Sequence, residues 1–155
     1  MTKLVQMSPR AIVIHCGDPR FQAAFREFLA SKALAEGFYI PLIIPGSIGN
    51  LVLSLRPKHV KVITEQLNLY LHRYPNIRII VINHEDCKAY AATVEKFRAF
   101  IPVTVFQKQK ADLTLGAKAI AAIAKQHGGT PTVELYMARI KEGEEIVFER
   151  VEEAP

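Results

Sequence analysis

The sequence predicts an α/β fold: a mainly parallel sheet with order 2-1-3 at its centre, flanked by helices, with a C-terminal β-hairpin. Three observations predict it. Short apolar runs rich in Ile and Val alternate with longer stretches of helical periodicity. Half of the 155 residues are hydrophobic and 23% are charged, which is typical of a chain with a packed core. Two runs near the end flank a Gly-containing turn, which indicates a hairpin. At this length we expect one domain over residues 1–155.

The expected strands are short runs of apolar and β-branched residues. The first, Ala11–Cys16, is rich in Ile and Val, and the second, Tyr39–Ile44, is closed by Pro45-Gly46. The third, Arg78–Asn83, is almost entirely apolar, as a strand covered by helices on both faces should be. A further short strand is expected over Ile101–Phe106.

The expected helices lie between these strands and carry apolar stripes or start and stop residues. Asp18-Pro19 supplies a cap and a first-turn proline for the first helix, which Gly37 ends. Pro57–Arg73 and Glu85–Phe100 are the next two helices, and the Ala-rich Ala111–His127 is the last.

The end of the chain predicts a hairpin of Thr132–Ile140 and Ile146–Val151 around a turn at 141–144. The preceding alternation of strands and helices implies right-handed crossovers and parallel pairing. Ligands of such sheets bind beyond the carboxyl ends of the strands, where the strand order reverses. With the order 2-1-3, the ends of the first and third strands are neighbours, so we expect a site there.

Charge and cysteine content exclude several classes of protein. The net charge is +5, and residues 141–155 carry six Glu against Lys141 and Arg150, so the other residues sum to +9. We interpret the excess as a solvated surface, because the basic cluster around His59 has no interleaved aromatic residues for stacking on nucleic acid. Two cysteines do not make a disulfide scaffold.

Neither a leader nor a membrane span is expected. The first ten residues contain no apolar core of a signal peptide. The longest apolar stretch, residues 39–55, is interrupted by Pro, Gly and Asn. The expected location is therefore the cytoplasm.

Residues with metal-binding and acid–base chemistry gather at two strand ends. Cys16, Asp18 and Arg20 follow the first strand, and His84 and Cys87 follow the third. Two thiolates and an imidazole suit Zn²⁺, a borderline-soft ion that binds sulfur and nitrogen in a tetrahedron. Three protein ligands leave a fourth position open, which is more typical of catalytic than of structural zinc. The alternative is a pair of buried apolar cysteines beside a hydrogen-bonded histidine.

The Asp18–Arg20 spacing lets both side chains face the same crevice. A guanidinium beside a carboxylate keeps it ionised and fixes its orientation. Asp18 can then accept a hydrogen bond from a zinc-bound water, or fill the fourth position itself. Because zinc lowers the pKa of its bound water toward about 7, such a site yields a hydroxide nucleophile at neutral pH.

Cys-x-Asp-x-Arg followed downstream by His-x-x-Cys resembles the signature of the β-class carbonic anhydrases. Gly49-Asn50 is similar to the end of a family loop, and His84-Glu85-Asp86-Cys87 is similar to a His-x-Asp-Cys variant of the family. The terminal hairpin resembles the closing strands of the family, so the resemblance spans most of the chain.

By this resemblance, Cys16, His84 and Cys87 ligate Zn²⁺, and Asp18 and Arg20 form the catalytic dyad. The implied activity is that of a zinc lyase, a carbonate dehydratase that reversibly hydrates CO2 to bicarbonate with a zinc-bound hydroxide. The resemblance also implies a homodimer or higher homo-oligomer with active sites at the subunit interface.

Several positions depart from the family pattern. Gly46-Ser47-Ile48 stands where the family has Arg-Asn-Ala, Pro19 replaces a Ser, and Gln6 is the one candidate for a pocket glutamine. Lys88 stands where the family usually has Gly, and a lysine there either blocks the pocket or attracts an anion such as bicarbonate. Two alternatives stay open: a zinc hydrolase of a CO2-like molecule (CS2 or COS), and a non-catalytic homologue with a binding or assembly role. Lys88 and the altered loop favour the second.

Overall fold

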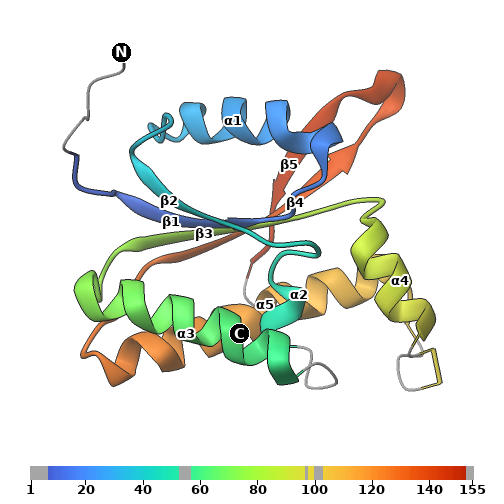
Figure 1. Ribbon diagram of the computed structural model, residues 1–155. Helices are drawn as coiled ribbons and strands as arrows, with labels where there is room; N and C mark the ends of the chain where they lie inside the picture. Colours follow the sequence, from blue (N-terminus) through green and yellow to red (C-terminus); the bar gives the residue numbers. More distant parts are fainter. Residues whose placement is uncertain (1–6, 53–56, 97, 100–102, 153–155) are drawn as a thin grey trace, which may run out of the picture.

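The five strands form one sheet in the order β2-β1-β3-β4-β5, seen in Figure 1 between two layers of helices. The computed structural model describes residues 7–52, 57–96, 98–99 and 103–152. The strands are β1 (Ala11–His15), β2 (Tyr39–Ile43), β3 (Arg78–His84), β4 (Val133–Ile140) and β5 (Ile146–Arg150). The β1–β2, β1–β3 and β3–β4 pairs are parallel, and β5 runs antiparallel to β4. The predicted α/β class, the central order 2-1-3 and the C-terminal hairpin are confirmed.

The two faces of the sheet are covered by different helices (Figure 1). The helical segments are η1 (Pro19–Phe21), α1 (Gln22–Ser31), α2 (Gly49–Val52), α3 (Pro57–Arg73), α4 (Lys88–Lys96), α5 (Val105–Gln126) and η2 (Glu142–Glu144). Helix α1 packs Phe25 and Leu29 on one face, and α3 and α5 cover the other with residues such as Leu67 and Ile120. Burial on both faces explains the unbroken apolar sequence of β3.

The first helix ends earlier than the sequence predicts. Helix α1 ends at Ser31 rather than at Gly37, because Ala33 takes a left-handed conformation (φ 59°) and Leu34 N–H donates to the Leu29 carbonyl. That backbone hydrogen bond closes the last turn as a glycine cap normally would. Gly37 also has positive φ (89°), but it lies in the turn that follows.

The prediction of a strand over Ile101–Phe106 is wrong for the part that the structure describes. Residues 101 and 102 lie outside the described residues, and Val105 and Phe106 begin α5. The Thr104 hydroxyl caps this helix by accepting the Gln107 N–H, while the Gln107 side chain accepts the Thr104 N–H. This reciprocal capping starts the helix six residues before the predicted Ala111.

The third predicted helix also begins at a different residue. Helix α4 starts at Lys88, not at Glu85, because Glu85 and Asp86 form a turn in which Asp86 has φ 52°. The turn carries the chain away from the end of β3 before the helix starts, and Cys87 lies between the two. None of the helices described is long and apolar enough to span a bilayer.

Candidate metal centre

Three metal-ligating side chains converge at the carboxyl ends of β1 and β3. These strands are parallel neighbours in which His15 pairs with Ile82, so Cys16 and His84 leave the sheet side by side. Cys87 follows after the tight turn and immediately precedes α4. One ligand atom from each of Cys16, His84 and Cys87 lies within 4.8 Å of the other two, and all three residues are buried. The strand order therefore joins segments that are distant in sequence, as predicted.

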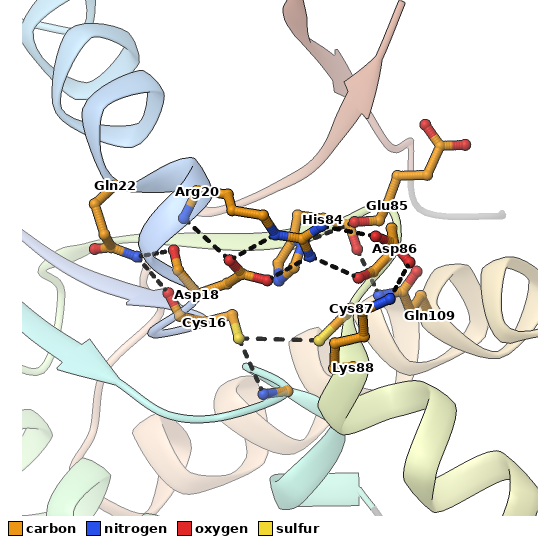
Figure 2. A network of polar contacts seen from close by, with 11 residues as sticks. Cys16, Asp18, Arg20, Gln22, His84, Glu85, Asp86, Cys87, Lys88 and Gln109 are labelled. Atoms are coloured by element: carbon orange, nitrogen blue, oxygen red, sulfur yellow. Dashed lines mark hydrogen bonds and ion pairs between the residues drawn. The ribbon is translucent and has the colours of Figure 1, made fainter. Parts of the chain in front are cut away.

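The two sulfur atoms are spaced as a tetrahedral ion requires. Cys16 Sγ and Cys87 Sγ are 3.9 Å apart and face each other in Figure 2. Two sulfurs that are each about 2.3 Å from one tetrahedral zinc ion lie about 3.8 Å apart. The backbone N–H of Gly46 donates to Cys16 Sγ at 3.3 Å, which favours the thiolate form that binds metal.

His84 presents an unused nitrogen at this position. Its Nδ1 lies 2.8 Å from the Glu85 carbonyl oxygen, which can only accept, so Nδ1 carries the proton. The other nitrogen, Nε2, is buried and makes no hydrogen bond to any residue that the structure describes. A histidine that donates one ring N–H to a carbonyl and keeps the other nitrogen free is the usual form of a metal ligand.

The segment that carries His84 is held by contacts on two sides. The Gln109 amide on α5 donates to the His84 carbonyl at 2.7 Å. The Glu85 carboxylate accepts the Ile140 N–H at 2.9 Å and pairs with Arg139, both on β4. The imidazole therefore rests on a fixed backbone, which is the support that a rigid metal ligand needs.

The pKa values of the two cysteine thiols are shifted in opposite directions. The hydrogen bond from the Cys87 thiol lowers the pKa of Cys16 to about 4, and the nearby His84 imidazole and the Gly46 N–H add to this effect. The hydrogen bond to Cys16 and burial raise the pKa of Cys87. The pair therefore shares one proton, and a cation that replaces this proton can bind both sulfurs as thiolates.

Both oxygens of the Asp18 carboxylate accept hydrogen bonds from Arg20. The guanidinium donates from Nη2 to Oδ2 at 2.7 Å and from Nε to Oδ1 at 3.0 Å, which is a bidentate geometry. The Arg20 N–H also donates to Oδ1 at 3.0 Å, so Asp18 caps η1. These hydrogen bonds, led by the guanidinium, lower the pKa of Asp18 to about 2. Asp18 is therefore ionised at neutral pH and acts as a hydrogen-bond acceptor.

Arg20 also holds Asp86, a motif residue to which the sequence analysis assigns no role. Arg20 Nη1 donates to Asp86 Oδ2 at 2.7 Å, and Nη2 donates to the Asp86 carbonyl at 3.0 Å. Figure 2 shows the guanidinium lying between the two carboxylates. It thus ties the loop after β1 to the turn after β3. The position of Asp86 directly before Cys87 is the signal that could have identified it.

Lys88 does not fill the crevice. Its side chain is 78% exposed, and its ammonium pairs with Asp86 Oδ1 at 3.2 Å. The positive φ of Asp86 and the start of α4 set this outward direction.

Gln22 is a second residue that the sequence analysis misses. Its amide donates to the Cys16 carbonyl at 3.0 Å and to the Asp18 carbonyl at 2.8 Å, and so fixes the loop that carries both side chains. Gln22 lies in the first turn of α1, four residues after Asp18, so the loop can reach it. Because a glutamine at a helix start is common, the sequence carries only a weak signal of this role.

A crevice opens above the two sulfurs. It has a volume of about 580 Å³ and is lined by the Cys16–Arg20 loop, Pro45, Cys87, Lys88 and Ala89. A small molecule can therefore approach the sulfurs and the Asp18–Arg20 pair from solvent.

The loop after β2 forms the back wall of this centre. Asn50 donates to the Pro45 carbonyl at 2.5 Å, and Ile48 is fully buried against α5. Of the departures from the family pattern, Gly46-Ser47-Ile48 therefore serves the packing of the loop, with Gly46 also bonded to Cys16. Gln6, the candidate pocket glutamine, lies outside the described residues.

No family model matches the chain, and no curated protein matches it. Among solved structures it is similar to the crystal structure of beta-carbonic anhydrase isoform I from the protozoan Trichomonas vaginalis, with 15% sequence identity and a TM-score of 0.49. The match covers 96% of this chain and 86% of that chain. So distant a likeness does not carry an activity from one protein to another.

Proposed function

We propose that the protein is a zinc-dependent enzyme that reversibly hydrates carbon dioxide to bicarbonate. One observation carries the proposal: two sulfurs spaced for one tetrahedral ion lie with a free imidazole nitrogen beside an ionised Asp18–Arg20 pair. Cys16, His84 and Cys87 would hold the ion and leave one position for a small molecule. The crevice above the sulfurs gives that position access to solvent.

Zinc bound by three protein ligands supplies Lewis acidity that lowers the pKa of a water molecule toward about 7. The residues of this chain supply orientation and charge. Asp18 has a pKa of about 2 and so accepts a hydrogen bond at every pH near neutrality, without giving up a proton itself. Arg20 fixes the direction of that acceptor through two hydrogen bonds. The reaction consumes one CO2 and one water, and releases bicarbonate and a proton to solvent.

The first test measures metal content and activity on the same preparations. The wild-type chain should bind one zinc per chain and accelerate CO2 hydration in a stopped-flow assay. Cys16→Ser and His84→Asn should weaken zinc binding by more than about 100-fold, because each removes a ligand rather than its support. His72→Asn, which removes an exposed imidazole from α3, is the matched control and should bind zinc as the wild type does.

The outcomes separate the proposal from its alternatives. Zinc bound at one per chain with no turnover of CO2 would support a non-catalytic zinc protein instead. Turnover of COS or CS2 without turnover of CO2 would support a hydrolase of CO2-like molecules. A chain that binds no zinc would leave the three residues as a buried polar cluster. Lys88 lines the crevice, but its ammonium pairs with Asp86, and this contact supports an open site over a blocked one.

A further inference from the structure

The two cysteines of the chain face each other as free thiols. The sequence contains Cys16 and Cys87 and no other cysteine. Their Sγ atoms are 3.9 Å apart and not joined in a disulfide, and Figure 2 shows each directed toward the other. The S–S bond of a disulfide is about 2.05 Å long. The sulfurs would therefore need to approach by about 1.9 Å, or roughly 1 Å each, to form this bond.

The backbone around the two cysteines allows this approach. Cys16 directly follows β1, and Cys87 lies between β3 and α4, so neither belongs to a strand or a helix. Arg20 donates to Asp18 on the first loop and to Asp86 on the second. This bridge keeps the two loops adjacent whether or not an ion lies between the sulfurs. Side-chain rotation and small shifts of the loops can thus close the gap without breaking the hydrogen bonds of the sheet.

A small oxidant can reach the sulfurs. Both cysteines line the solvent-accessible crevice of about 580 Å³. Cys16 is 5% exposed and Cys87 is 2% exposed, which favours an oxidant of the size of a hydroperoxide over a bulky disulfide reagent. The Gly46 N–H donates to Cys16 Sγ at 3.3 Å and so favours the thiolate form, which is the form that attacks peroxides.

We propose that Cys16 and Cys87 form a redox site that hydrogen peroxide oxidises reversibly to an intramolecular disulfide when no metal is bound. The Cys16 sulfur attacks one oxygen of the peroxide, the O–O bond breaks, and one water leaves as Cys16 becomes a sulfenic acid. The Cys87 sulfur then attacks the Cys16 sulfur, and the sulfenic oxygen leaves as a second water with the Cys87 proton. Two thiols lose two electrons in total, and one peroxide is reduced to two waters. A dithiol reductant reverses the change by thiol–disulfide exchange.

The disulfide and a bound zinc ion exclude each other. Two sulfurs that ligate one tetrahedral zinc lie about 3.8 Å apart as thiolates, whereas a disulfide holds them at about 2.05 Å with no thiolate left. Zinc should therefore protect the thiols, and oxidation should prevent zinc binding. The disulfide itself needs no zinc, and only this competition rests on the proposed function.

The first experiment treats the reduced, metal-free full chain with one equivalent of hydrogen peroxide. Alkylation followed by intact mass measurement counts the free thiols, which should fall from two to none and return to two after dithiothreitol treatment. Proteolysis without reductant should yield one cross-linked peptide pair that contains Cys16 and Cys87. The zinc-loaded chain should lose its thiols at least about tenfold more slowly, because the metal occupies the nucleophile.

Two variants separate the steps. Cys87→Ser lacks the second thiol, so dimedone should label a sulfenic acid at Cys16 that the wild type does not accumulate. His84→Asn keeps both sulfurs and removes the imidazole ligand. It should form the disulfide to the same final extent as the wild type, but added zinc should no longer protect it. His72→Asn is the matched control for the loss of an imidazole, and zinc should protect it as it protects the wild type.

The outcomes distinguish this inference from the proposed function. A disulfide between two chains would overturn the inference, as would a sulfinic acid at Cys16 with the Cys87 thiol intact. Equal oxidation rates of the zinc-loaded and metal-free chains would overturn the competition between metal and disulfide. A wild type that forms the disulfide but binds no zinc would support the redox site and contradict the zinc enzyme. A zinc-binding chain whose metal-free form resists peroxide would do the reverse.

Discussion

The Arg20 side chain connects the two loops that form the candidate metal centre. It bonds Asp18 on the loop after β1 and Asp86 on the turn after β3. We expect Asp18→Asn to keep zinc and to lower the rate of CO2 hydration by about 100-fold or more, because the ionised acceptor is lost. Asp86→Asn removes one charge-assisted bond to the guanidinium, and we expect a loss of about tenfold in rate with zinc binding intact.

Stopped-flow rates beside zinc analysis of the same samples check these two expectations. Lys88→Ala removes the other cation on Asp86, and a loss as large as that of Asp86→Asn would show that the Arg20 contact is not what matters.

Candidate metal ligands are easier to predict from the sequence than the residues that hydrogen-bond to them. Cys16, His84 and Cys87 could be selected because thiols and imidazoles are rare and stand at strand ends. The structure brings them together, and their roles as ligands stay predictions. The contacts of Gln22, Asp86 and the Gly46 N–H could not be predicted, because they depend on loop conformations that no periodicity encodes.

Individual elements follow their local signals where those signals are strong. The described part of helix α3 spans Pro57–Arg73, the predicted range, since its apolar stripe and its first-turn proline agree. Helix α5 begins before its predicted start, at a capping box formed by Thr104 and Gln107. The end of α1 could not be foreseen, because Ala33 takes a left-handed conformation that usually requires glycine.

The contact between α5 and Ile48, the residue directly before α2, yields a prediction for this part of the fold. Gly116 lies against Ile48, and a Cβ at this position would lie 2.1 Å from Ile48 Cγ1. Gly116→Ala should therefore destabilise the chain by about 1–3 kcal/mol, despite the higher helix propensity of Ala. In urea unfolding, Ile48→Ala combined with Gly116→Ala should cost less than the sum of the single changes. Strictly additive free energies would contradict the predicted clash.

At the scale of the whole molecule, Arg78 links two strands of the sheet to the end of α1. Arg78 on β3 pairs with Glu134 on β4 at 2.5 Å and donates to the Lys32 carbonyl at the end of α1. The hydrogen bond from Arg78 lowers the pKa of Glu134, with the Tyr136 hydroxyl adding to the effect. A carboxyl with a lowered folded-state pKa stabilises the chain fully above its unfolded value of about 4.3. That contribution is lost as pH falls through the folded-state pKa.

Glu134→Gln should accordingly cost about 1–3 kcal/mol of unfolding free energy at pH 7. The difference from the wild type should shrink as the pH falls below about 4. Urea unfolding of both proteins at a series of pH values measures this, and a difference that is constant with pH would refute it. Arg150→Gln, an exposed change at the end of β5, controls for the loss of a surface charge.

The separation of the two facing cysteines along the chain has a consequence for the energetics of folding. Cys16 and Cys87 are 71 residues apart in sequence, so their sulfurs meet only after β1 and β3 have paired. By chain-entropy arguments, closing a loop of this length costs about 4 kcal/mol in an unfolded polypeptide. An ion bound by both sulfurs would therefore cross-link the ends of β1 and β3. Its removal by a chelator would weaken the middle of the sheet rather than an edge.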